Sequence, residues 1–246
     1  MAIEGLRRRT GRQTTGGLGN IARAFAHRNY LVYVSGNSIS LIGWWLERVA
    51  VGWLTWTLTH SGAWLGLISL ADFLPVLFLA PFAGVLADRR DRVWTIRITQ
   101  WIGCVQASLL AILVVSDAMT IEILFALVLM LGIASGVAQP SRLALIPTLV
   151  DRESLASALA INSVIFNLAR FIGPALAGIV IAEIGIAAAF AANAVSYIAF
   201  QISLLNLRGL PPQPAVGRQN VRAPRSRRSP MPAGIPGSGP CCCSLS

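Results

Sequence analysis

The chain has 246 residues, of which 55% are hydrophobic and 12% are charged, and its mean hydropathy is +0.66. These values exclude a water-soluble domain with a charged surface and predict an integral membrane protein. The formal net charge of +10 does not indicate a nucleic-acid partner, because the excess charge lies at the two ends. Residues 1–30 contain six arginines against one acid, and residues 209–246 contain five arginines and no acid.

Six apolar runs lie between these ends, each close to the ~20 residues with which a helix crosses a ~30 Å hydrocarbon core. In chain order they are 31–57, 64–87, 94–115, 120–139, 158–182 and 187–207. We therefore predict an all-α membrane protein with six transmembrane helices in residues 31–208, preceded by a basic cytoplasmic N-terminus at residues 1–30.

The tail at residues 209–246 has a different composition, with eight prolines, no acid and no aromatic residue. Such a segment cannot bury enough apolar surface to fold, so we expect it to be disordered. A frameshifted reading of GC-rich DNA and a genuine cytoplasmic extension both remain open as its origin. All 20 basic residues of the chain are arginine, which favours a GC-rich, bacterial genome.

The arginines between the runs predict the orientation. They occur in the gaps after the second and fourth runs and are absent from the other gaps: Arg89, Arg90, Arg92, Arg142 and Arg152. By the positive-inside rule, both termini then lie in the cytoplasm. We expect a multi-pass protein of the bacterial inner membrane whose basic N-terminus contacts the headgroups of membrane lipids.

Charged side chains also occur inside the runs, where each costs at least ~2.5–3.5 kcal/mol on insertion scales. At ~1.5 Å per residue, Arg48 lies ~14 Å from the outer end of the first run and Asp72 lies ~12 Å from that of the second. We predict that these two residues pair, either to neutralise each other or as part of a transport pathway. The intramembrane candidates for coupling are Glu47, Arg48, Asp72, Asn167 and Arg170.

The fifth run has a polar face interrupted by small residues. Helical spacing places on one face Ser163, Asn167, Arg170, Pro174 and Gly178. Gly173, Pro174 and Gly178 form a candidate packing motif, which suits either a helix that slides against its neighbour or a fixed seam. Gly132 and Gly136 in the fourth run have the G-x-x-x-G spacing, which we interpret as helix packing only.

A short charged signature lies between the second and third runs: Gly84, Asp88, Arg89 and Arg92. The glycine permits close helix approach, the aspartate can accept hydrogen bonds from a helix N-terminus, and the arginines suit cytoplasmic headgroups. An ordinary positive-inside loop would explain the charges alone. The spacing resembles the G-x-x-x-D-R-x-G-R signature of the major facilitator superfamily, with Asp91 in place of its second glycine.

Two further stretches support this resemblance. Residues 169–178 are similar to the G-x-x-x-G-P-x-x-G-G element in the fifth helix of exporters of this superfamily, with alanines at 169 and 177 in place of two glycines. Residues 140–174 are similar to the branch that contains enterobactin exporters and macrolide-efflux proteins. Members of the superfamily have twelve helices in two halves, each made of two inverted three-helix repeats. The resemblance therefore implies that this chain corresponds to the N-terminal half.

The implied function is secondary active, proton-coupled efflux of a small lipophilic substrate of the drug or siderophore type, with a second half or self-association to complete the transporter. The alternative is a non-transporting membrane fragment or a self-associating six-helix membrane protein. An enzyme is disfavoured, because the sequence contains no H-E-x-x-H motif and no Gly-rich phosphate loop, and His27 and His60 both lie outside the runs. We expect no cofactor and no metal site.

Overall fold

The computed structural model describes residues 27–89 and 91–207, and for residues 80–89 it describes the helical backbone alone. Six long helices account for nearly all of this part of the chain. They are α3 (Arg28–Thr59), α4 (Gly62–Arg89), α5 (Arg92–Val115), α6 (Ile121–Leu149), α7 (Leu155–Glu183) and α8 (Ile186–Leu205). The prediction of six helices from six apolar runs is confirmed. For the signature residues Gly84, Asp88 and Arg89, the structure describes the backbone but not the side chains. The predicted tail lies outside the described residues.

Local sequence explains where several helices begin and end. Asp91 caps α5 by accepting a hydrogen bond from the backbone N–H of Val93 at 2.9 Å. Thr120 caps α6 in the same way, through the N–H of Ile123 at 3.4 Å. Helix α3 ends at His60, whose backbone is left-handed, with φ of 47°. These short polar connections separate helices that are otherwise almost continuously apolar.

The boundary predicted for the fourth run is wrong. We expected its helix to end near residue 139, but α6 continues through Pro140 and Pro147 to Leu149. Proline removes one backbone donor, which a helix packed among other helices can tolerate. Leu145 is fully buried in the core beside α3 and α5, and this packing supports the final turns of α6. Arg142, assigned to a loop by the sequence, is therefore part of a packed helix.

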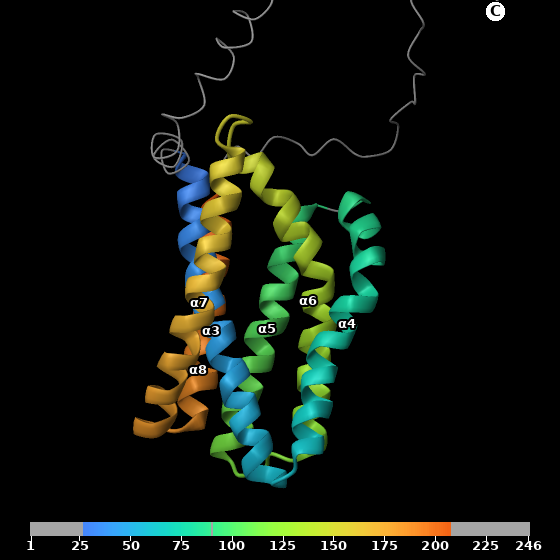
Figure 1. The fold of residues 1–246 in the computed structure, drawn as a ribbon, viewed down its shortest axis with the longest axis vertical. Helices are drawn as coiled ribbons and strands as arrows, with labels where there is room; N and C mark the ends of the chain where they lie inside the picture. The colour runs from blue at the N-terminus through green and yellow to red at the C-terminus, as the bar shows by residue number, and fades with distance from the viewer. Residues whose placement is uncertain (1–26, 90, 208–246) are drawn as a thin grey trace, which may run out of the picture. The chain divides into compact units, whose positions relative to one another are not determined.

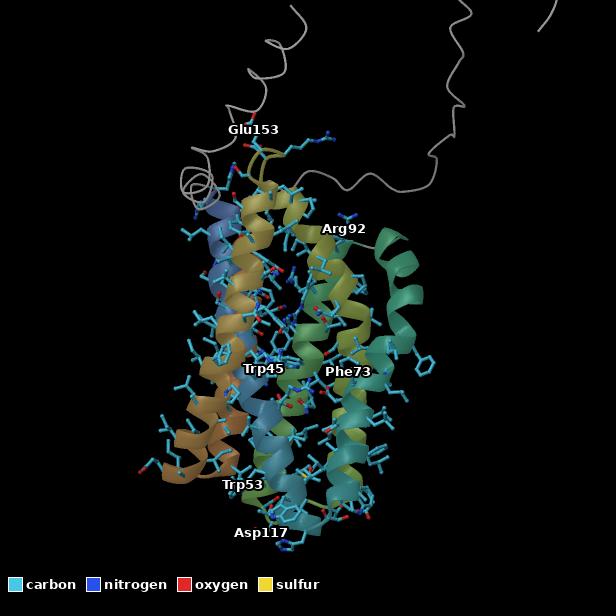
Figure 2. The ribbon with its side chains drawn as sticks, in the orientation of Figure 1. Trp45, Trp53, Phe73, Arg92, Asp117 and Glu153 are labelled. Carbon is cyan, nitrogen blue, oxygen red and sulfur yellow. The ribbon has the colours of Figure 1, made fainter. Side chains whose placement is uncertain are left out.

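The helices alternate in direction and form a bundle (Figure 1). Helix α3 packs against α7 and α8, α5 packs against α8 and α6, and α4 packs mainly along α6. The α4–α5 and α6–α7 connections lie at one end of the bundle, and the other three connections lie at the opposite end (Figure 1). Figure 2 places Arg92 and Glu153 at the first end and Asp117 at the second. The connections after the second and fourth runs thus lie at the same end, as the arginine pattern predicts. Which of the two ends faces the cytoplasm stays a prediction.

Two glycines of α6 lie where this helix packs closely against α4. A Cβ placed on Gly132 of α6 would lie 2.8 Å from the backbone oxygen of Ala71 in α4, and one on Gly136 would lie 3.1 Å from that of Pro75. The packing interpretation of this G-x-x-x-G pair is confirmed.

Among the described residues, only one of the two glycines in the packing motif predicted for the fifth run lies at a helix crossing. A Cβ on Gly173 of α7 would lie 3.1 Å from the backbone oxygen of Ile42 in α3, so this glycine lies at a close crossing. A Cβ on Gly178 would meet nothing within 4 Å in the described part of the chain, so this glycine lies at no helix crossing there. Pro174 lies inside α7, which continues through it to Glu183.

Five of the described helices, α4 to α8, are long and apolar enough to cross a membrane. Helix α3 has 32 residues but carries several polar side chains, and its Asn37 and Glu47 are buried inside the bundle. Large apolar side chains cover the exterior, among them Phe73 at 62% and Phe171 at 76% exposed. An apolar exterior around a polar interior is what a bilayer requires, so this is a multi-pass membrane protein.

Candidate functional site

An ion pair joins α3 to α4 near the middle of the bundle. Nη1 of Arg48 lies 2.7 Å from Oδ2 of Asp72, with the two side chains 33% and 16% exposed. The neighbouring residues Trp45 and Phe73 lie at about mid-height of the helices in Figure 2. The pairing predicted from depth along the two runs is confirmed. Within the membrane interior, each charge greatly reduces the cost of burying the other.

Two tryptophans of α3 hold the guanidinium in place. The Cζ atom of Arg48 lies 4.7 Å from the ring centroid of Trp44 and 5.6 Å from that of Trp45. Such cation–π contacts strengthen where water is partly excluded. Arg170 of α7 approaches Trp45 at 5.6 Å as well. The aromatic pair therefore connects two intramembrane arginines that the sequence singled out separately.

Glu47 faces a different set of neighbours and makes a buried polar network. It is 2% exposed. Its Oε1 accepts a hydrogen bond from Nε2 of Gln106 on α5 at 2.9 Å, and its Oε2 accepts one from Nδ2 of Asn193 on α8. Ser196 in turn donates to Oδ1 of Asn193 at 2.8 Å. Three helices are thus joined through one carboxyl, because a buried acid needs donors for both of its oxygens.

A central cavity of about 970 Å³, counting the space at its mouth, opens beside the ion pair. It receives side chains from all six described helices. Its polar lining includes Arg48, Asp72, Thr99, Gln139 and Arg142, and its aromatic lining consists of Trp44, Phe73, Phe166 and Tyr197. A smaller cavity of about 500 Å³, counting the space at its mouth, is also lined by the ion pair and reaches Glu47. Apolar and aromatic walls with a few converging polar groups are typical of sites for small molecules.

Arg142 was not predicted to line a cavity, because its position between two apolar runs indicated a loop. The side chain lines both the central cavity and a second cavity of about 740 Å³ that includes Tyr33, Asn37 and Asn167. The one available signal was helical periodicity: Leu145 and Ile146 continue the apolar pattern beyond Pro140.

Asn167 and Arg170 lie on the exposed face of α7. The amide of Asn167 donates to the backbone oxygen of Ser163, one turn earlier, at 2.8 Å. Arg170 contacts Trp45, as described above, and has no ion pair among the described residues. These residues are therefore not brought to the Arg48–Asp72 pair. Asn167 instead lines the second cavity.

Of the charged loop signature, the structure describes the side chain of Arg92 alone. Its Nη1 donates to the backbone oxygen of Ala144 on α6 at 2.8 Å. This contact ties the start of α5 to the last turns of α6, which a loop arginine directed only at headgroups would not do.

These features define a class: a polytopic α-helical membrane protein with an ion pair and a polar cavity at mid-height between its helices, the architecture of secondary transporters. A family model described as transmembrane secretion effector matches residues 23–222. The chain belongs to this family, which is part of the major facilitator superfamily of transporters.

Several bacterial transporters are similar to this chain. A staphyloferrin A transporter of Staphylococcus aureus is 31% identical over 166 residues, which cover 67% of this chain and 42% of that protein. An enterobactin exporter, EntS, of Citrobacter koseri is 30% identical over 198 residues, which cover 79% of this chain and 47% of that protein. The chain thus spans less than half the length of these relatives. No solved structure matches it.

Proposed function

We propose that this chain forms the substrate-binding half of a proton-coupled exporter of small lipophilic compounds of the drug or siderophore type in the bacterial cell membrane. Transport as a class follows from the family. Efflux of a siderophore is what the name of the enterobactin exporter of Citrobacter koseri suggests. The observation that carries the proposal is the Arg48–Asp72 pair in the wall of a cavity large enough for a small molecule.

The pair supplies the chemistry that coupling requires. A proton that binds Asp72 neutralises its carboxylate and weakens its hold on Arg48 at 2.7 Å. The freed guanidinium can then interact with substrate or with a different helix. Proton binding and the shape of the cavity are thereby linked through one contact between α3 and α4. Because α4 packs mainly along α6, this contact adds a charged link between α4 and α3.

The chain's partners follow from the same proposal. The apolar exterior contacts membrane lipid, the cavity takes a small-molecule substrate, and both termini lie in the cytoplasm. A second six-helix half or a second copy of the chain completes the transporter, since relatives that carry out transport are about twice as long.

The test is an efflux assay in a bacterium lacking its major exporters. One strain expresses this chain alone, and another expresses it with the separately encoded C-terminal half of a relative. We expect uncoupler-sensitive efflux in at least one strain and its loss in Asp72→Asn. Glu183→Gln, at the exposed end of α7, is the matched control and should retain efflux. Stable insertion without efflux in both strains would favour the non-transporting alternative.

A further inference from the structure

Arg142 lines the cavities without a counter-ion. Its Nε is buried and has no hydrogen-bond partner, and its Cζ lies 5.6 Å from the ring centroid of Phe200. No acidic side chain lies within ion-pair distance of it in the described ranges, 27–79 and 91–207. An arginine presents five donors in a planar fork, and here the aromatic contact supports the fork without supplying an acceptor. The guanidinium is thus preorganised for an acceptor that the described chain does not provide.

The charges that line the central cavity do not balance. Arg48 is neutralised by Asp72 at 2.7 Å, whereas Arg142 is not neutralised. Glu47, the other buried acid nearby, opens toward the smaller cavity, and both of its oxygens already accept hydrogen bonds from amides. The central cavity therefore has a positive excess at one defined position, next to aromatic walls.

We propose that Arg142 is the specificity-determining residue of the cavity and that it selects an amphipathic anion, with a carboxylate or a similar planar oxyanion on the guanidinium and an aromatic or lipophilic body against Trp44, Phe166 and Tyr197. This inference rests on the proposed function and deepens it by naming the charge of the substrate. A bidentate carboxylate satisfies two donors of the fork and neutralises the excess charge. A neutral compound of the same shape leaves the charge of Arg142 uncompensated. The cavity therefore discriminates against neutral compounds, because they leave a guanidinium in its wall without an acceptor.

The second cavity agrees with this assignment. Arg142 lines both this cavity and the central one, and the second cavity is also lined by amide and hydroxyl groups from Tyr33, Asn37 and Asn167. An anion held at Arg142 can therefore place further polar groups among neutral donors and acceptors. No other charged side chain lines that cavity.

The experiment measures binding to the purified full chain in lipid nanodiscs by equilibrium dialysis. The probes are 2-naphthoate and 2-naphthamide, which have the same ring system and nearly the same shape and differ in charge. The variants are Arg142→Gln, Arg142→Lys and the control Arg152→Gln, which changes an exposed arginine in the α6–α7 connection. We expect the unaltered chain to bind the anion at least about tenfold more tightly than the amide. Arg142→Gln should abolish this preference, Arg142→Lys should retain part of it, and Arg152→Gln should leave it unchanged.

The affinity for 2-naphthamide shows whether each variant keeps an intact cavity, so a folding defect is distinguished from a lost anion contact. Equal affinity of the unaltered chain for both probes, or a preference that persists in Arg142→Gln with amide binding intact, would overturn the assignment and leave the exporter proposal standing. If the amide also fails to bind Arg142→Gln while Arg142→Lys binds the amide and retains part of the anion preference, Arg142 acts as proposed. If neither probe binds the unaltered chain, the cavity is not a ligand site, and both the assignment and the proposed function in its present form are refuted.

Discussion

Removing one partner of the Arg48–Asp72 pair should destabilise the bundle more than removing both. Arg48→Ala leaves the carboxylate of Asp72, which is only 16% exposed, without a cation. Opposite unit charges ~4 Å apart attract by about 4 kcal/mol at an effective dielectric constant of ~20, and desolvation offsets part of this. Loss of one partner of a buried pair typically costs about 3–5 kcal/mol. Because Arg48 is 33% exposed beside a cavity, we expect about 2–3 kcal/mol here.

The double variant Arg48→Ala with Asp72→Ala removes both charges and should recover part of that loss, giving a coupling energy of about 1–2 kcal/mol. The assay is denaturant unfolding of the four proteins in mixed micelles, followed by tryptophan fluorescence, together with the amount of each protein found in the membrane. Arg48→Ala combined with Glu183→Ala is the control, because Glu183 is exposed at the far end of α7 and should give additive losses. Additivity in the Arg48–Asp72 cycle as well would show that the 2.7 Å contact contributes no net stability, and the coupling argument built on it would fail.

The remaining predictions concern packing, the buried network and orientation. Gly173→Leu should separate α7 from α3 and cost about 1–3 kcal/mol in the same unfolding assay, whereas Gly178→Leu, in the same helix but facing open space, should change stability by less than about 0.5 kcal/mol. Glu47→Ala leaves two buried amide donors unpaired and should cost at least about 2 kcal/mol, and a loss no larger than that of Gly178→Leu would contradict the network. In intact cells, a cysteine at Ser61 should react with an impermeant thiol reagent and one at Arg152 should not, and the reverse pattern would invert the predicted orientation.

Depth in the membrane was predictable from sequence, because the rise per residue of a helix is fixed. Arg48 and Asp72 lie at similar distances from the ends of their runs, and each is costly alone, so pairing was the favourable solution. The same logic identified Gly132 and Gly136 as packing residues. Both predictions used distances along one helix axis, which an apolar run specifies well.

Which side chains of different helices face one another was not predictable in this way. Gln106 and Asn193 are amides inside apolar runs, and nothing in their spacing shows that both point at Glu47 from two other helices. The end of α6 was missed for a different reason. Pro140 is a strong local signal for a helix end, but burial of Leu145 and Ile146 against the core outweighs it, and this tertiary packing cannot be read from one segment.

Adjacent residues of α3 therefore have separable roles. Glu47 joins α3 to α5 and α8 through neutral amides, and a proton on its carboxyl would remove no ion pair among the described residues. Arg48, about 100° further around the helix, joins α3 to α4 through a charge pair that a single proton weakens. A network of neutral donors suits a fixed framework, whereas an ion pair in a cavity wall suits a contact that opens and closes. If the α4–α6 pair moves relative to α3, α5 and α8 during transport, the Arg48–Asp72 contact is an ion pair in the cavity wall that must break, which is why the efflux test is placed on Asp72 rather than on Glu47.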